Sequence, residues 1–389
     1  MGEARGGYEP AFVALARIVR SRAGLRSSHP AVTTIAATVS HGELRELVRR
    51  RTRALGAGAV LVHDDDPLAA LVGVLAGLRL RRSVRVVPAR SGDAALRAAM
   101  ACDAPGLVLH TAGTTGAARP APARPGPRTA AQRLGIVGML PPLIRPVVGT
   151  LAAVDHGHGL SAALLALLLG GRVVVGEESV RAQERLDVLT GVPWQLERFA
   201  RDGPIPRIRL VLSGSDELRD PDALERALGA PVHEAYGTTE TGTLTVASPD
   251  DRRRYPGTVG QPLPGVRIRA SGGVLVVRAP ALGRGTFSAD RGRVEGGFVH
   301  VDGRADDVFV SAGLNIPVGA IRRWLARHAP NATLGWDDDV RFGKRLHVTT
   351  EDDPLALRER LRAEFGRAAP TVSAQVSAAP IWDPTTTNR

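Results

Sequence analysis

The sequence predicts an α/β fold, in which a large N-terminal domain combines mixed and parallel sheets with helices. Short apolar runs alternate with amphipathic helical segments through the first half of the chain. Such alternation favours a parallel sheet with helices packed on its faces. Apolar residues make up 43% of the 389 residues, an ordinary share for a globular protein with a large core. One cysteine excludes a disulfide framework and a cysteine-based zinc site, and it fits a reducing compartment.

The formal net charge of +12 comes almost entirely from arginine, which is scattered among alanine, glycine and proline. A nucleic-acid surface clusters its basic residues and interleaves aromatic ones, and aromatics make up only 4% here. We therefore expect no nucleic-acid partner, whereas a basic surface suits polyanions such as ATP and coenzyme A. The longest apolar stretch, 160–169, is about half the roughly 20 residues of a membrane helix. With no signal-peptide pattern at the start, we expect a cytoplasmic protein without a membrane span.

Helix starts are marked by their capping residues. Ser40 and Glu43 form the pattern of a capping box ahead of a predicted helix over 43–55. The three aspartates at 64–66 precede Pro67, and this predicts a helix start rather than a metal site because helix N-termini favour acids. Further helices are predicted over 67–77, 132–144 and 354–368, and another helix is predicted to end at residue 169. The predicted strands are 59–62, 83–87, 106–109, 147–154, 172–175, 209–212, 274–278 and 345–349.

The stretch 110–119 has the composition of a phosphate-binding loop. It follows the strand at 106–109 and holds two glycines, three threonines and an arginine, with no bulky apolar side chain. Glycines let backbone N–H groups approach an anion, and the hydroxyls and the guanidinium add donors and charge. The loop lacks the lysine of a Walker-type loop, and a plain polar turn is the alternative. The candidate phosphate-binding residues are Thr111, Gly113, Thr114, Thr115 and Gly116.

A second glycine pattern supports a different interpretation. Gly157, Gly159 and Ala162 match the dinucleotide fingerprint between a strand and a helix, and Glu177 follows the next strand. On this interpretation the protein is a dinucleotide-dependent oxidoreductase. A pair of metal-ligating histidines in the same stretch is a third interpretation, but no further ligand is placed to complete such a site.

Three motifs in order resemble the adenylate-forming superfamily, which includes acyl-CoA synthetases, aryl-CoA ligases and peptide-synthetase adenylation domains. Residues 111–116 resemble its phosphate loop, although Ala118 and Arg119 replace the usual Pro-Lys. Residues 236–240 (Tyr-Gly-Thr-Thr-Glu) and 303–307 (Gly-Arg-Ala-Asp-Asp) resemble its later motifs. The resemblance covers about residues 38 to 389.

The resemblance implies a two-step ligase. A carboxylic acid, of the fatty or aryl kind, attacks Mg·ATP to give acyl-AMP, and coenzyme A or a carrier-protein thiol then takes the acyl group. It also implies two domains, an AMP-binding domain at 1–305 and a small α+β lid at 306–389, with Asp306 as the hinge.

The resemblance further implies roles for single residues. His156 would lie beside the acyl carboxylate, Thr239 would bond the α-phosphate, and Glu240 would bind Mg²⁺. The remaining residues would hold the nucleotide or the thiol, with Gly214, Ser215 and Tyr236 at adenine, Asp290 and Arg304 at ribose or phosphate, and Gly313 at the pantetheine tunnel.

The family's closing lysine has no counterpart in residues 384–389, and Lys344 is the only lysine in the chain. Three interpretations stay open: the chain stops short of the lysine, Arg389 replaces it, or the protein is a catalytically impaired nucleotide-binding relative. We expect poor adenylation with retained acyl transfer, because a planar guanidinium is an imperfect substitute for a compact ammonium.

Overall fold

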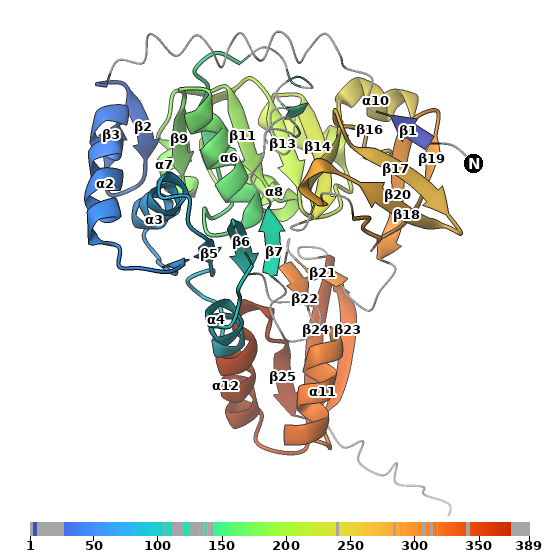
Figure 1. Ribbon diagram of the computed structural model, residues 1–389. Coiled ribbons are helices and arrows are strands. Elements are labelled where there is room, and N and C mark those ends of the chain that lie inside the picture. The colour runs from blue at the N-terminus through green and yellow to red at the C-terminus, as the bar shows by residue number, and fades with distance from the viewer. Residues whose placement is uncertain are drawn as a thin grey trace, which may run out of the picture.

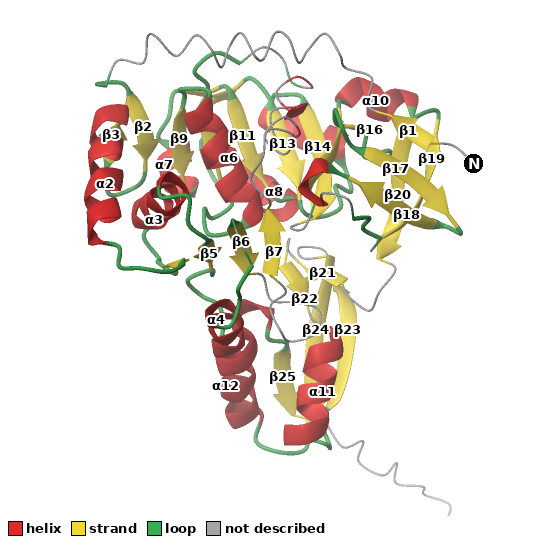
Figure 2. Ribbon diagram, viewed as in Figure 1, coloured by secondary structure: helices red, strands yellow, loops and turns green. Residues whose placement is uncertain are grey.

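The computed structural model describes residues 3–5, 27–104, 106–110, 120–123, 132, 135–136, 138, 140, 143–238, 241–282, 285–288, 290–304, 309–311, 314–316, 318–339 and 343–374. Figure 1 shows a broad upper part built on several sheets, with a smaller sheet-and-helix part below it. Helices and strands alternate through the upper part, as Figure 2 shows, and this confirms the α/β prediction.

The largest sheet among the described residues has nine strands and runs through the centre of the upper part. Six adjacent strands of this sheet, from β14 to β2, run parallel to one another. Antiparallel strands close both of its edges. In spatial order the strands are β16 (Gln261–Pro262), β15 (Gly242–Ala247), β14 (Val232–Thr238), β13 (Val211–Gly214), β11 (Val188–Gly191), β8 (Val147–Thr150), β9 (Arg172–Val175), β2 (Pro30–Thr33) and β3 (Thr38–Ser40).

Both faces of this sheet are buried, because successive side chains of a strand point to opposite faces. Val173 and Val188 belong to one hydrophobic cluster, whereas their chain neighbours Val174 and Leu189 belong to another. The helices packed with these clusters are α2 (His41–Ala54), α3 (Pro67–Arg79), α6 (Gly157–Leu168), α7 (Glu177–Arg181), α8 (Pro193–Arg201) and α9 (Pro221–Leu228).

A second sheet has four strands, three before the predicted phosphate loop in the chain and one after it. Its strands are β4 (Val60–Val62), β5 (Val84–Val86), β6 (Leu107–His110) and β7 (Pro120–Ala123), and helix α4 (Asp93–Met100) follows β5. The predicted strands do not include β7. The structure pairs β7 antiparallel with β6 at the edge of the sheet, where a proline without an N–H is tolerated.

An antiparallel sheet follows the large one and packs over its β15 end through a separate cluster that includes Leu244, Ile268 and Leu275. Its strands are β1 (Glu3–Arg5), β17 (Arg267–Ser271), β18 (Val274–Arg278), β19 (Asp290–Glu295) and β20 (Phe298–Arg304). The short elements beside these sheets are β10 (Arg185–Leu186), β12 (Arg207–Ile208), α10 (Pro249–Arg254) and η2 (Pro280–Leu282).

The C-terminal part has its own core around Ile321, Val348 and Leu361. Its elements are β21 (Phe309–Ser311), β22 (Leu314–Ile316), α11 (Val318–His328), β23 (Thr333–Asp339), β24 (Gly343–Thr350), α12 (Pro354–Phe365), η3 (Gly366–Ala368) and β25 (Thr371–Ala374). Helix α12 lies against α4, as Figure 1 shows, and Arg97 forms an ion pair with Glu364 at 2.8 Å. A separate core joined by a polar contact fits the predicted α+β lid.

The capping residues confirm the predicted helix starts. Ser40 and Glu43 form the capping box of α2, and Asp66 caps α3 ahead of Pro67. The predicted strand at 147–154 is shorter in the structure and ends at Thr150. No helix in the described part of the chain is long and apolar enough to cross a bilayer.

Candidate functional site

Polar side chains gather where the parallel strands of the largest sheet end. His156 follows β8, Thr190 lies in β11, Ser215 follows β13, and Tyr236 lies near the end of β14. Because these strands are parallel neighbours, their carboxyl ends meet at one edge of the sheet, where α/β proteins bind ligands.

Asp155 holds the ring of His156. His156 is the N-cap residue of α6 but makes no side-chain capping bond. Its Nδ1 donates to Asp155 Oδ1 at 2.7 Å, and this bond fixes the orientation of the ring. Asp155 Oδ2 also accepts a bond from the Ala89 N–H at 2.9 Å. Burial raises the pKa of Asp155, but the His156 and Ala89 bonds, with the charge of Arg367, outweigh it and hold that pKa below its usual value.

The neutral ring of His158 carries its proton on Nε2. Thr190 Oγ1 donates to the Leu212 carbonyl at 2.8 Å, so it must accept from His158 Nε2 at 2.6 Å. Nδ1 of His158 is then an acceptor, 3.5 Å from Ser215 Oγ. Burial lowers the pKa of His158 to about 4, so this ring is neutral at pH 7.

Backbone geometry brings the β13 turn close to the His158 ring. A Cβ on Gly214 would lie 2.9 Å from the Ala235 carbonyl and 3.2 Å from the ring, so the close packing requires glycine. Ser215 has φ of 72°, a left-handed conformation that is uncommon outside glycine and frequent at functional sites. The two predicted residues Gly214 and Ser215 therefore form a tight turn that packs against the His158 ring.

Three other predicted residues meet beside this turn. Tyr236 Oη donates to Asp290 Oδ2 at 2.5 Å, and Asp290 is 5% exposed. Asp290 is also the direct strand partner of Arg304 across β19 and β20. The structure thus joins the end of β14 to the antiparallel sheet through residues 54 positions apart.

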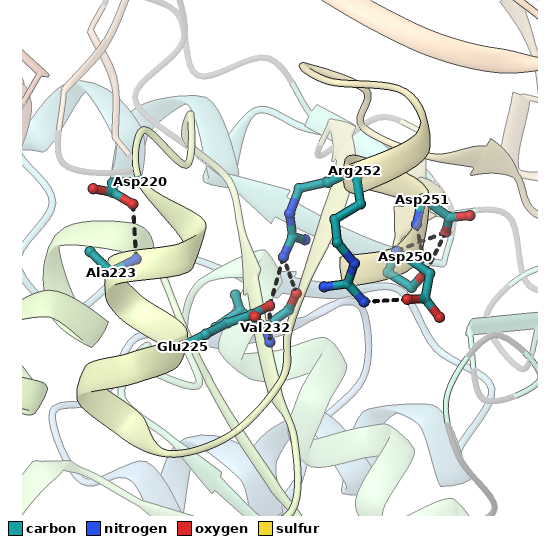
Figure 3. A network of polar contacts seen from close by, with 9 residues as sticks. Asp220, Ala223, Glu225, Val232, Asp250, Asp251 and Arg252 are labelled. Carbon is teal, nitrogen blue, oxygen red and sulfur yellow. Dashed lines mark hydrogen bonds and ion pairs between the residues drawn. The ribbon is translucent and has the colours of Figure 1, made fainter.

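A polar network holds the start of β14. Figure 3 shows Arg252 reaching from α10 to Glu225 of α9 at 2.9 Å and to the Val232 carbonyl at 2.7 Å. Glu225 also accepts from the Val232 N–H at 3.0 Å. Glu234 lies two residues further along β14, and burial raises its pKa to about 7. The charge of Arg252 lowers this pKa, but by less than burial raises it.

Gln132 supports the turn after β14. Its Nε2 donates to the carbonyl oxygens of Thr241 and Thr243, both at 2.9 Å, and its side chain is buried. Thr241 in turn accepts from the Thr238 N–H at 3.0 Å. These bonds fix both sides of the two positions, 239 and 240, at which the sequence predicts catalytic residues.

Several predicted site residues lie outside the described residues, and their roles stay predictions. They are Thr111, Gly113, Thr114, Thr115, Gly116, Thr239, Glu240 and Gly313. For Arg304 the structure describes the backbone alone. Within the described part of the chain, no group of three His, Cys, Asp or Glu side chains could hold a metal ion.

The glycine pattern of the dinucleotide alternative has a packing explanation. A Cβ on Gly159 would lie 2.2 Å from the Ala153 carbonyl, so the first turn of α6 requires glycine there. Glu177 forms ion pairs with Arg181 and Arg198 instead of projecting as a ribose-binding acid. The structure therefore explains this pattern without a dinucleotide.

The sequence did not reveal the roles of Asp155, Thr190 and Gln132, or that of His158. An acid directly before His156 and a glutamine opening an apolar helix were the available signals. Neither signal reveals its partner, because the partners lie 66 and 109 positions away along the chain.

Residues 70–273 match the family model described as "AMP-binding enzyme". The chain belongs to this family. The matched segment contains the whole edge from His156 to Tyr236, and this confirms the predicted superfamily. Family membership gives the dinucleotide-dependent oxidoreductase alternative no support.

Curated relatives match over part of their length. An uncharacterized acyl–CoA ligase, YhfT of Bacillus subtilis (strain 168), is 29% identical over 209 residues, which are 44% of this chain and 43% of the relative. The mitochondrial malonate–CoA ligase ACSF3 of Mus musculus is 29% identical over 216 residues, which are 46% of this chain and 36% of the relative. The matches thus span less than half the length of these relatives.

Solved structures share the fold over nearly the whole chain. The amide bond synthetase McbA of Marinactinospora thermotolerans gives a TM-score of 0.77 at 19% identity, covering 93% of this chain and 96% of McbA. A malonyl-CoA ligase in complex with methylmalonyl-CoA and AMP gives 0.74 at 23% identity, covering 95% and 99%. Such identities show the fold alone, including that of the C-terminal part.

Proposed function

We propose that this protein activates a carboxylic acid with ATP and transfers the acyl group to a thiol. In the first step a carboxylate oxygen attacks the α-phosphorus of ATP, and the bond to pyrophosphate breaks to give acyl-AMP. In the second step a thiol such as coenzyme A, or that of a carrier protein, displaces AMP. The observation that carries the proposal is the convergence of His156, Tyr236 and Asp290 at one sheet edge within an AMP-binding family match.

The described residues suit nucleotide binding by position and charge. Tyr236 offers an aromatic face for adenine, and Asp290 offers a carboxylate for the ribose hydroxyls. The backbone of Arg304 is the strand partner of Asp290. The turn at Gly214 and Ser215 adds backbone groups at the same edge. Chemistry of this kind depends on positioning and charge stabilisation rather than on a protein nucleophile.

The proposal includes Mg²⁺ as a companion of ATP. Glu240 would hold it, since this ion binds through one or two carboxylates together with phosphate oxygens. When bound, the ion neutralises phosphate charge. Thr239 would bond the α-phosphate, and the loop with Thr111, Gly113, Thr114, Thr115 and Gly116 would wrap the terminal phosphates. Gln132 supports this assignment, because it holds the backbone at Thr241 and Thr243, directly after these two positions in the chain.

His156 is proposed to orient the acid. Its Nδ1–H is engaged by Asp155, so Nε2 is the atom left to meet the substrate. The sequence predicts a fatty or aryl acid as the substrate. An acyl-CoA synthetase that activates fatty acids belongs to fatty acid metabolism. The name of one relative, a malonate–CoA ligase, adds malonate as a second candidate. His158 and Ser215 add polar atoms at the same edge of the sheet, and these favour a short polar acid.

The division into residues 1–305 and 306–389, with a hinge at Asp306, is part of the proposal. The separate core of the C-terminal part supports it, and Gly313 would then line the thiol path. The single cysteine, buried Cys102, fits a reducing compartment, so the proposal includes a cytoplasmic location.

The test is ATP–pyrophosphate exchange with malonate, methylmalonate, octanoate and benzoate in turn. We expect exchange with at least one acid, and AMP binding by calorimetry that weakens on Asp290→Ala. The matched control is Asp93→Ala, which removes an exposed carboxylate at the start of α4. NADH binding without any response to AMP would overturn the proposal.

A further inference from the structure

A cavity of about 600 Å³ opens at the edge of the largest sheet opposite the candidate site. Val147 begins β8 and Arg172 begins β9. Asp187 directly precedes β11, and Arg209 lies two residues before β13. These are the amino ends of the strands whose carboxyl ends carry the candidate site. A strand of four residues spans about 13 Å, so the two sites are separate.

Charge in this cavity is strongly uneven. Its charged lining residues are four arginines and two acids: Arg145, Arg172, Arg185, Arg209, Glu184 and Asp187. We call this the arginine pocket. The apolar side chains in its lining, Ile144 and Val147, are few, so the recognition it offers is electrostatic.

The lining of the pocket carries more positive than negative charge, with four arginines against two acids. Asp187 divides its carboxylate between the Val147 N–H at 2.9 Å and Arg185 at 3.1 Å. Arg172 donates to the neutral Gln183 Oε1 at 2.8 Å. Arg172 is half-buried, so its guanidinium has lost part of its hydration, and this burial lowers the pKa of Arg172. A partly desolvated cation bonded to a neutral oxygen is stabilised by an added anion.

We propose that the arginine pocket binds a small polyanion whose charge is carried by phosphoryl groups, in the class of di- and triphosphates. Guanidinium groups present planar forks of donors that match phosphate oxygens, and several forks around one cavity match a ligand with several phosphoryl groups. A volume of about 600 Å³ is that of a small-molecule pocket. This proposal does not depend on the proposed function, because no residue of the candidate site lines the pocket.

The test is calorimetry with inorganic tripolyphosphate, at fixed ionic strength and with AMP present to occupy a nucleotide site. The pocket variant is Arg185→Ala/Arg209→Ala, since both residues are exposed and their loss leaves the core intact. The matched control is Arg51→Ala/Arg53→Ala on α2, which removes the same charge from an exposed helix surface. Thermal melting checks that both variants fold.

We expect tripolyphosphate binding to weaken at least tenfold in the pocket variant and by less than twofold in the control. Hydrogen exchange should slow in residues 143–148 and 183–187 when the ligand binds. Citrate at the same charge and ionic strength should bind at least tenfold more weakly. Absent binding, equal weakening in both variants, protection confined to 154–160 and 212–216, or equal affinity for citrate would each overturn the proposal.

Discussion

The Asp155 carboxylate accepts a hydrogen bond from His156 Nδ1 at 2.7 Å and another from the Ala89 N–H at 2.9 Å. Ala89 lies in the turn after β5, three residues before Gly92, which is the N-cap of α4 and packs against the C-terminal part. Arg367 of that part also lowers the pKa of Asp155. One side chain therefore links the proposed acid-orienting histidine to the surface on which the C-terminal part rests.

We predict that Asp155→Asn impairs use of the acid more than use of ATP. The amide keeps one acceptor oxygen, so it can satisfy His156 or Ala89 but not both, and it loses the charge. We expect kcat/KM for the acid to fall about tenfold, as for a lost charge-assisted hydrogen bond, while KM for ATP stays constant. Pyrophosphate-exchange kinetics measure both constants. Asp93→Asn, an exposed control, should change neither, and equal effects on acid and ATP would contradict this role.

Gly92→Ala should displace the C-terminal part without unfolding the large one. Gly92 has φ of −80°, which alanine adopts freely. An added Cβ would nevertheless lie 2.5 Å from the Glu364 carbonyl oxygen across the contact. We expect a larger radius of gyration by small-angle scattering, with an unchanged thermal midpoint for the main transition. Gly56→Ala is the matched control, because its Cβ would meet nothing within 4 Å. An unchanged radius would show that the contact yields locally.

Glu234→Gln should stabilise the protein at high pH. The folded state raises the pKa of Glu234 from 4.5 to about 7, so folding favours the protonated form. The contribution of this group is fully present below pH 4.5 and is lost as pH rises towards 7. A neutral glutamine avoids that loss, and a shift of this size corresponds to about 3 kcal/mol at most.

Urea unfolding at pH 4.5 and pH 8 measures this effect. The variant and the parent should have similar free energies of unfolding at pH 4.5, and the variant should be more stable at pH 8. Glu178→Gln, on the exposed side of α7, is the control and should show no such dependence. A variant that is less stable than the parent at pH 8 would show that the Glu234 charge is compensated.

Tyr236→Phe should weaken AMP binding by about tenfold. The change removes the hydroxyl that donates to Asp290 at 2.5 Å but keeps the aromatic face. Asp290 is largely buried, so loss of this donor both disorients its carboxylate and costs stability of about 1–2 kcal/mol. Calorimetry with AMP checks the affinity. Tyr255→Phe is the matched control, since that ring stacks on Phe298 away from the nucleotide residues. Unaltered AMP affinity in Tyr236→Phe would remove Asp290 from the site.

The sequence predicted most of what depends on near neighbours in the chain. Ser40 and Glu43 are three positions apart, and the structure confirms their capping box; β9 and β18 have the predicted bounds. The strand at β7 was missed, because its pairing with β6 is a contact between segments and its prolines argue against a strand. The order of the motifs was sufficient for the family, which the match over 70–273 confirms.

By itself the sequence determined the α/β class, the helix starts and the residue types available for nucleotide chemistry, since each follows from local spacing and side-chain chemistry. Only the tertiary structure decided which of those residues meet. It paired Asp155 with Ala89 and Tyr236 with Asp290, and it gathered four arginines into one pocket at the far edge of the sheet. The order of the strands in the largest sheet sets these contacts. That order depends on how both faces of the sheet are buried against helices that lie far away in the chain.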